Sequence, residues 1–468
     1  MAMRRLKRFI IKEWPVFFLI LVGIVVRIYI FRHMRPGIHT DSITFFFLNE
    51  LDMVRTPGYP FFIEFLLSIN DLIPVTTDYV RLICFGQLFF LGVLNSLLLY
   101  RIAYLLTRNR IFSLLMGIFY NFNYFIIGFE FQLLTETLSI TLLFSVIVLY
   151  LQFFKGKKSL ALFAGILMVL LIYARPSFLL LGIFLPILTF FGFYPKEKKG
   201  SFLKKLAPLW ILFIAVNIIG AGGWALRNKI KFDYFGISSL MPYQLRYYTN
   251  PLFKKYKPSG NEKVDKVAEI YTEEFEKGKY SSATVYNFHL RLRKEMGFTD
   301  AEIAGLFGKV NFKLIKDYPL DYLKQVPASV LSYYRQYSPY WTGGNAQRFL
   351  NNRAIIPGMF RSFFLFYKQL FTNLYFLAVL MIAAPLILFS LVHKNRLAFH
   401  GWFIIVAVIH YNCFVSTLTT IAGINNLRYR APVEPLILLV FYAAIFYSIK
   451  WIGKIINSKL MIGRAGKQ

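Results

Sequence analysis

Most of this chain consists of long apolar segments separated by shorter polar ones. A helix needs about 20 predominantly apolar residues to cross the hydrocarbon core of a bilayer. We therefore predict an all-α, polytopic membrane protein with about ten transmembrane helices. The predicted spans are 15–31, 80–105, 110–128, 134–154, 159–175, 178–194, 206–224, 366–392, 399–421 and 431–450.

Two apolar stretches need separate interpretations. Segment 58–75 contains Glu64, Asn70 and Pro74, so we expect an interfacial or re-entrant helix there. The basic residues in front of segment 15–31 also occur in signal peptides. That segment is longer than a usual signal-peptide core, contains Arg27 and lacks a small-x-small cleavage site. We therefore predict that it is a retained first transmembrane helix.

Basic residues alternate along the loops. The 54 Lys and Arg residues outnumber the 23 Asp and Glu residues, which gives a net charge of +31. Lys and Arg concentrate in the cytoplasmic loops of membrane proteins. We therefore place both termini in the cytoplasm, and the excess charge indicates topology rather than nucleic-acid binding. The basic clusters fall on every second loop: MAMRRLKR, YLLTRNR, FFKGKKS, YPKEKKGSFLKK, VHKNR and IKWIGKIINSKLMIGRAGKQ.

The remaining loops form the predicted outer face, and two of them are long. Loop 32–79 follows the first span, and its apolar residues predict interfacial helices. Segment 231–364 lacks a spanning run and contains a Thr299–Glu302 capping box, which predicts a small helical extracytoplasmic domain. The predicted organisation is an N-terminal transmembrane core, 1–230, this outer domain, and C-terminal transmembrane helices with a basic tail, 365–468.

Composition and motifs exclude several classes of protein. The chain is 57% hydrophobic and 16% charged, whereas soluble domains are about 45–50% apolar and about 25% charged. Cys84 and Cys413 lie in apolar runs and give no disulfide or metal spacing, and the six histidines are scattered. The sequence also contains no Walker loop, GxSxG or HExxH motif.

Acidic residues on the outer face need an explanation, because a carboxylate near the bilayer is costly unless it is paired or used. Asp41, in HTDSITFFF, either caps the following helix or acts as a general base in a cleft. Glu136, in TETL, either interacts favourably with the dipole of the helix that begins there or supplies a second acid to that cleft. Glu50 and Asp52 are expected as partners of Arg55 or as solvated groups.

Five arginines also lie on the outer face, where the positive-inside rule makes them unexpected. Two of them have a structural alternative. Arg175 would extend its charged group to the membrane interface, and Arg430 would pair with Glu434 at i,i+4 spacing. A guanidinium group also binds phosphate bidentately. Together with an acid, these arginines predict a site that holds a lipid phosphate and deprotonates an acceptor hydroxyl: Arg55, Arg175, Arg227, Arg428 and Arg430.

Several motifs together resemble one family. They are RTPGYP after the first outer acid, TETL before the fourth span, ARPSFLLL, GGWALRN, and RYRAPVEPLILL at the last span. The chain resembles the GT-C superfamily of membrane glycosyltransferases, in particular the bacterial branch that includes protein O-mannosyltransferases and the lipid A aminoarabinose transferase. The resemblance covers 1–230 and 365–450, and segment 231–364 matches only in position.

The resemblance implies a reaction and a catalytic base. A sugar would pass from a polyprenyl-phosphate donor to an acceptor hydroxyl of a glycan, lipid or protein, with inversion, at the extracytoplasmic face of the cell membrane. The base would be Asp41, with Glu136 as a second acid. Family members often carry two adjacent acids where this chain has Asp41 followed by Ser42, so the helper acid stays open between Glu136 and Glu50.

The resemblance also implies how the donor is bound. Arg428 and Arg430 are the first candidates for the donor phosphate, ahead of the other three outer arginines. Tyr59, Tyr429 and Asn228 are expected along the lipid or acceptor groove. Some relatives use a divalent metal and others do not, and the sequence leaves this choice open.

Two other functions compete with this one. A lipid-linked glycan flippase or transporter would carry polar residues at mid-membrane and two similar halves. In this sequence the ionisable groups are expected at span ends, and the halves are dissimilar. An O-antigen ligase or glycan polymerase would also use outer arginines, but it would not need an acid in the first outer loop.

Overall fold

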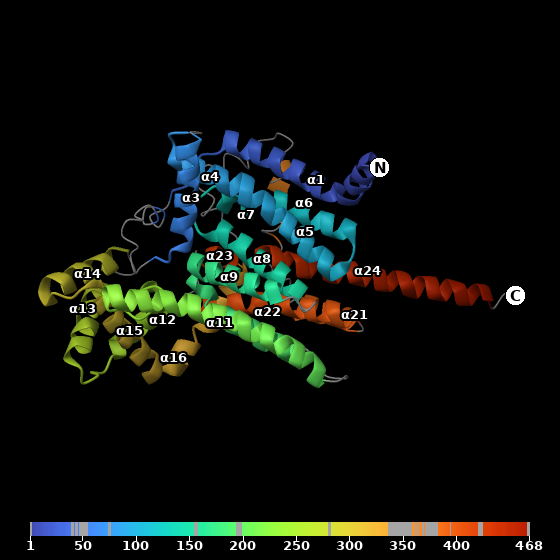
Figure 1. Ribbon diagram of the computed structural model, residues 1–468. Coiled ribbons are helices and arrows are strands. Elements are labelled where there is room, and N and C mark those ends of the chain that lie inside the picture. Colours follow the sequence, from blue (N-terminus) through green and yellow to red (C-terminus); the bar gives the residue numbers. More distant parts are fainter. Residues whose placement is uncertain are drawn as a thin grey trace.

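The computed structural model is helical along nearly all of the chain that it describes (Figure 1). The described residues are 2–38, 42, 45, 55–73, 76–153, 158–192, 199–278, 282–335, 358–359, 361–362, 365–366, 369, 382–393, 395–419 and 425–465. The first helices are α1 (Ala2–His33), α3 (Gly58–Leu72), α4 (Tyr79–Phe85), the π-helix η1 (Gly86–Gly92), α5 (Val93–Thr107), α6 (Arg110–Phe122), α7 (Tyr124–Glu130), α8 (Glu136–Phe153), α9 (Lys158–Ala174), the 3-10 helix η2 (Pro176–Phe178), α10 (Leu181–Gly192) and α11 (Lys199–Phe232). They are followed by α12 (Leu240–Thr249), the 3-10 helix η3 (Asn250–Lys255), α13 (Glu262–Gly278), α14 (Ser282–Met296), α15 (Asp300–Asp317), α16 (Pro319–Leu323), α17 (Val326–Arg335), α21 (Ala384–Val392), α22 (Arg396–Thr419), α23 (Asn425–Arg430) and α24 (Glu434–Ala465).

Many of these helices are apolar enough to lie in a membrane. Five described stretches are also long enough to cross it: Glu13–His33, Tyr79–Thr107, Leu206–Phe232, Ala398–Thr419 and Glu434–Asn457. The bent pair α6–α7 makes a sixth span if it is counted as one, and three further apolar helices are shorter. Together these stretches coincide with nine of the ten predicted segments, and the tenth, 366–392, is described only in part. The chain is therefore a multi-pass integral membrane protein.

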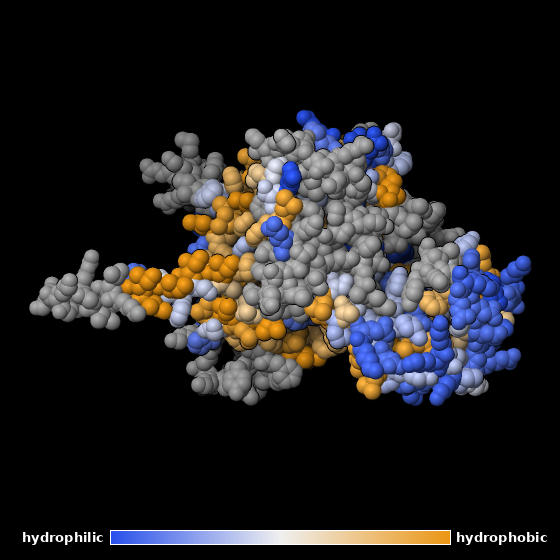
Figure 2. All heavy atoms as spheres, turned by 180° about the vertical axis from the view of Figure 1, so that it is seen from behind, coloured by the Kyte–Doolittle hydropathy of each residue, from blue (hydrophilic) through white to orange (hydrophobic). Residues whose placement is uncertain are grey.

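The apolar helices form one bundle with a single large core. Helices α5, α6, α8, α9, α11 and α22 pack side by side along it. Both ends of the chain lie at the end of the bundle opposite α12–α16 (Figure 1). On the face that Figure 2 shows, apolar side chains cover much of the coloured part of the bundle, whereas hydrophilic side chains gather over the region of α13–α15. This pattern fits a bundle surrounded by lipid with a polar domain at one end.

Helices α12–α16 form that polar domain, which has a core of its own, whereas α17 packs against α22 and α23 of the bundle. Aromatic and aliphatic side chains between Leu252 and Leu314 are packed together, separate from the bundle core. The Thr299–Glu302 capping box that starts α15 is confirmed, because each residue's side chain bonds the other's backbone N–H. The domain contacts the bundle through the Tyr248 hydroxyl, which donates to the Thr417 carbonyl at the end of α22.

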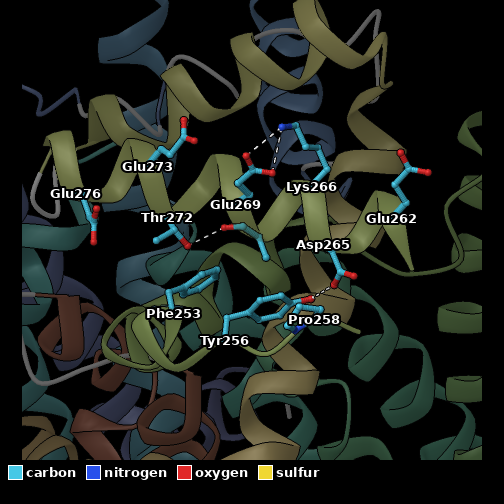
Figure 3. A pocket seen from close by; sticks show the side chains of 11 residues that line it. Phe253, Tyr256, Pro258, Glu262, Asp265, Lys266, Glu269, Thr272, Glu273 and Glu276 are labelled. Atoms are coloured by element: carbon cyan, nitrogen blue, oxygen red, sulfur yellow. Dashed lines mark hydrogen bonds and ion pairs between the residues drawn. The ribbon is translucent and has the colours of Figure 1, made fainter. Parts of the chain in front are cut away.

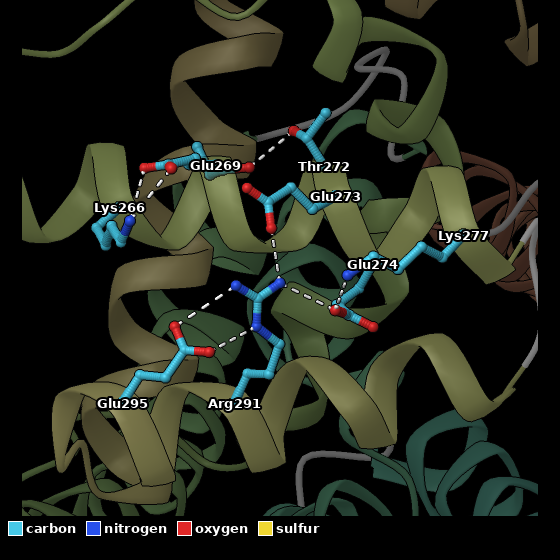
Figure 4. A network of polar contacts seen from close by, with 9 residues as sticks. Lys266, Glu269, Thr272, Glu273, Glu274, Lys277, Arg291 and Glu295 are labelled. Atoms are coloured by element: carbon cyan, nitrogen blue, oxygen red, sulfur yellow. Dashed lines mark hydrogen bonds and ion pairs between the residues drawn. The ribbon is translucent and has the colours of Figure 1, made fainter.

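A polar network joins α13 to α14 in this domain (Figure 4). The Arg291 guanidinium donates to Glu273 at 2.7 Å, to Glu274 at 3.0 Å and to Glu295 at 2.9 Å. Burial raises the pKa of Glu274, but hydrogen bonds from Arg291 and Lys277 outweigh it, so the pKa lies below its ordinary value. The network therefore stabilises the folded domain above the unfolded Glu pKa of about 4.3, and this contribution is lost as the pH falls further.

Replacing the centre of this network tests its contribution. We expect Arg291→Met to lower the local opening free energy of α13 and α14 by about 1 kcal/mol, because three carboxylates lose their shared partner. Hydrogen exchange of the full-length protein in detergent would measure this change. Lys294→Met, an exposed change on the same helix, is the matched control and should leave exchange unaltered. Equal effects of the two variants would contradict a stabilising role for the network.

Candidate active site

Three segments that are far apart in the sequence meet at the side chain of Glu136. Glu136 is the first residue of α8, and its side chain is fully buried. Arg428 of α23 places its Nε 2.5 Å from Oε1 of Glu136, and Arg175 places its Nη1 3.7 Å from the same oxygen. Arg175 also donates from Nη2 to the backbone carbonyl of Arg428 at 3.2 Å. We refer to Glu136, Arg175 and Arg428 as the Glu136 cluster.

Local sequence explains why these charges lie at helix ends. Pro176 disfavours helical backbone at the residue before it, and Arg175 is extended, with φ −151° and ψ 101°. The arginine therefore lies in the break between α9 and η2 instead of inside the apolar helix. Glu136 lies in the first turn of α8, where a negative charge interacts favourably with the helix dipole.

The Glu136 cluster is not fully satisfied by the protein around it. Its three side chains carry one negative and two positive charges, and the Arg428 side chain is 14% exposed. Among the described residues, Oε2 of Glu136 and Nη1 of Arg175 are buried without a hydrogen-bond partner. Buried polar atoms usually have partners, so unsatisfied ones need an explanation. The arrangement is suited to binding an additional anion.

The start of the first outer loop is attached next to this cluster. The Leu133 N–H donates to the Gly37 carbonyl at 3.2 Å, and the Ser42 hydroxyl donates to the Leu133 carbonyl at 2.8 Å. Leu133 precedes Glu136 by three residues. The predicted base Asp41 lies outside the described residues, as do Glu50 and Asp52.

The RTPGYP turn of this loop packs against the backbone just before Arg175. A Cβ on Gly58 would lie 2.5 Å from the backbone nitrogen of Ala174 and 2.8 Å from the Tyr173 carbonyl oxygen. Only glycine permits this approach, and Ala174 directly precedes Arg175. The next residue, Tyr59, is fully buried and donates its hydroxyl to Gln87 at 2.9 Å.

Arg430 lies near Arg428 in the sequence but has a different environment. It is fully buried, with its Nε 2.5 Å from Oε2 of Glu434 at i,i+4 spacing. Its Nη1 donates to the carbonyl oxygens of Tyr333 at 2.8 Å and Tyr334 at 2.6 Å. These contacts connect α23 to α17 and α24.

Arg27 and Glu130 form a further buried ion pair, which the sequence analysis did not predict. Arg27 of α1 makes two parallel 2.9 Å hydrogen bonds to the Glu130 carboxylate at the end of α7, and a 2.7 Å bond to Asn121. Both partners have no exposed surface. Because Arg27 lies inside a span, the expectation that ionisable groups occupy span ends is wrong for this residue. The sequence signal was a charged residue in each of two otherwise apolar segments.

The other predicted residues are distributed around the bundle end. Arg227 lies over the Trp224 ring, 4.6 Å from its centroid, and donates to Asn228 at 2.7 Å. Asn228 is fully buried and donates to the carbonyl of Gly236, which holds the chain after α11.

Two aromatic rings sit under predicted arginines. Arg55 lies over the Phe45 ring, 5.0 Å from its centroid. Arg175 lies over the Tyr429 ring at 5.3 Å, and the Tyr429 hydroxyl donates to Gln244 of α12 at 3.3 Å. Tyr429 therefore links the Glu136 cluster to the outer domain.

A groove of about 740 Å³ along α13 offers a different kind of surface (Figure 3). Its acids are largely bonded within the domain: Asp265 accepts from the Tyr256 hydroxyl at 2.6 Å, and Glu269 accepts from Lys266. Burial raises the pKa of Asp265, but hydrogen bonds from Tyr256 and Ser259 outweigh it and lower it overall. An acidic groove repels a lipid phosphate, so it does not serve as the donor site.

The described residues do not fit a divalent metal ion. Within the described ranges, no group of three or more His, Cys, Asp and Glu side chains is arranged to hold one. Glu130 and Glu136 each face arginines rather than a second acid.

Comparisons with known proteins find a likeness of fold. No protein-family model and no curated protein sequence matches the chain. The solved structure of the archaeal oligosaccharyltransferase AglB from Archaeoglobus fulgidus, in complex with an inhibitory peptide and a dolichol-phosphate, is similar with a TM-score of 0.50 at 11% identity. The match covers 96% of this chain and 52% of AglB, so the chain spans about half of that protein's length. The fold therefore resembles that of about half of AglB.

The contact at Gly58 gives a test of how the cluster is assembled. Gly58→Ala should lower the thermal unfolding temperature by several degrees, because the methyl group would overlap the backbone beside Arg175. Gly222→Ala is the matched control, since a Cβ there meets nothing within 4 Å. Thermal unfolding of both variants in detergent checks the prediction. A Gly58→Ala protein as stable as Gly222→Ala would rule out tight packing at this turn.

Proposed function

We propose that this protein is a membrane glycosyltransferase that uses a polyprenyl-phosphate-linked sugar as donor. The sugar passes with inversion to an acceptor hydroxyl on a glycan, lipid or protein at the extracytoplasmic face of the cell membrane. The observation that carries the proposal is the Glu136 cluster, in which two guanidinium groups, one buried and one partly buried, lie side by side and Nη1 of Arg175 has no hydrogen-bond partner. The likeness to AglB, whose structure contains a dolichol-phosphate, supports the lipid-phosphate class of donor.

The proposal includes an orientation in the membrane. Ten spans place both termini on one side, and the alternating basic loops assign that side to the cytoplasm. Helices α12–α17 are then extracytoplasmic. The position of both chain ends opposite α12–α16 supports this arrangement (Figure 1).

Arg428 and Arg175 bind the donor phosphate in this proposal. Arg428 is the more accessible of the two, and Arg175 is held against it by the bond to its carbonyl. Arg430 has three internal acceptors and no exposed surface, so we assign it the positioning of α23. Arg227 and Arg55 are secondary candidates at the edge of the site.

The chemical step is a direct displacement. The acceptor oxygen attacks the anomeric carbon, its proton passes to the Asp41 carboxylate, and the bond between that carbon and the phosphate oxygen breaks. The electron pair of this bond remains on the phosphate, whose added negative charge the two arginines stabilise. The attachment of Ser42, the neighbour of Asp41, to Leu133 supports a base near the cluster. Glu136 is the second acid of the proposed site.

Aromatic and amide residues complete the proposed groove. Tyr429 is partly exposed beside Arg175, so it is the residue best placed to contact donor or acceptor. Tyr59 and Asn228 are fully buried with internal partners. We therefore propose that they shape the groove from behind.

Removing the phosphate ligand tests the donor site. Arg428→Ala should lower kcat/KM for the lipid-linked donor roughly 10- to 100-fold, because one charge-assisted contact to phosphate is lost. The acceptor KM should change little. Arg101→Ala, an exposed change on α5, is the matched control. Steady-state transfer in detergent or nanodiscs measures the effect. Equal loss of donor and acceptor use in Arg428→Ala would count against the phosphate role.

Removing the base tests the chemistry separately. Asp41→Asn should reduce sugar transfer at least 100-fold while binding of the lipid-linked donor is retained, because the amide cannot accept the acceptor proton. A binding assay and a single-turnover transfer assay on the same purified protein distinguish these steps. Near-normal transfer by Asp41→Asn would refute the base assignment.

A further inference from the structure

The position of Glu136 suggests a role beyond that of a second acid. Its carboxylate contacts the same two guanidinium groups to which the proposed function assigns the donor phosphate. The Nε group of Arg428 is directed at Oε1 of Glu136. The donor phosphate and this carboxylate therefore require the same hydrogen-bond donors.

The two anions cannot use these donors at the same time without cost. Like charges at contact distance repel strongly in a poorly solvated site. The cluster is such a site, since Glu136 is fully buried and the Arg175 side chain is 8% exposed. A phosphate on Arg428 must therefore displace or neutralise the carboxylate.

We propose that Glu136 is an internal counter-ion that occupies the phosphate site between turnovers, an inference that rests on the proposed function. In the empty enzyme it holds Arg428 and Arg175 together, because two poorly solvated guanidinium groups without an anion would repel each other. When the donor arrives, its phosphate takes the place of the carboxylate on Arg428. The unsatisfied Oε2 of Glu136 and Nη1 of Arg175 are the atoms expected of a site that exchanges partners.

The exchange has a consequence for product release. After sugar transfer the lipid phosphate is a monoester and carries more negative charge than the donor phosphodiester. It would bind two arginines tightly and slow the next cycle. Return of the Glu136 carboxylate to Arg428 favours its departure. Glu136 is thus a positioning residue whose removal changes binding and turnover in opposite directions.

Binding of farnesyl phosphate to the full-length protein tests this inference, with farnesol as the uncharged control. Glu136→Gln should bind farnesyl phosphate about tenfold or more tightly than the unmodified protein, because no internal anion competes for the arginines. Farnesol binding should not change. In steady-state transfer, both kcat and the donor KM of Glu136→Gln should fall, as expected when product release becomes slow.

Glu130→Gln is the matched control. It also removes one carboxylate from a fully buried arginine pair, but its partner is Arg27 and not the phosphate site. Its affinity for farnesyl phosphate should stay within about twofold of the unmodified protein. Glu136→Asp keeps the charge but shortens the side chain, so its affinity for farnesyl phosphate should be intermediate. It replaces Glu136→Gln in the test if that variant does not fold.

The outcomes separate this inference from the proposed function. If Arg428→Ala weakens farnesyl phosphate binding but Glu136→Gln and Glu136→Asp do not strengthen it, the counter-ion role is refuted and the phosphate site stands. If Arg428→Ala binds as tightly as the unmodified protein, the phosphate site itself is refuted. Tighter binding by Glu136→Gln and Glu130→Gln alike would also overturn the inference, because the effect would not depend on the cluster.

Discussion

The buried carboxylate of Glu136 is the interaction on which the geometry of the site depends. An ionised carboxylate removed from water costs several kcal/mol unless it is paired and hydrogen-bonded. Its partners come from the break after α9 and from α23, so burial of this one charge fixes three segments, two of which are 292 positions apart. The Gly58 contact adds the first outer loop to the same assembly.

Ion pairs have a particular role in a bundle of this composition. In lipid, apolar helix surfaces gain little from contacting one another rather than the surrounding chains, so packing and polar contacts determine which helices associate. Arg27 and Glu130 join α1 to α7, and Arg430 with Glu434 joins α23 to α24. These pairs therefore restrict how the helices that they connect can assemble. The Glu136 cluster differs from the Arg27–Glu130 pair because Oε2 of Glu136 and Nη1 of Arg175 lack hydrogen-bond partners. It differs from the Arg430–Glu434 pair because the Arg428 side chain is partly exposed.

The spans could be predicted from the sequence because membrane thickness sets their length. The capping box at Thr299 could be predicted because its pattern is local. The i,i+4 spacing likewise suggested the Arg430–Glu434 pair, as one of two alternatives. The pairing of Arg428 with Glu136 could not be predicted, since it spans 292 positions and depends on the whole bundle. The Arg27–Glu130 pair was missed for the same reason.

The most direct test of the account is an experimental structure of the full-length protein in nanodiscs with a bound polyprenyl monophosphate. The account predicts phosphate density within hydrogen-bonding distance of the Arg428 and Arg175 guanidinium groups, with the Glu136 carboxylate moved away from Arg428. Phosphate density elsewhere on the bundle, with the contact between Glu136 and Arg428 intact, would contradict it.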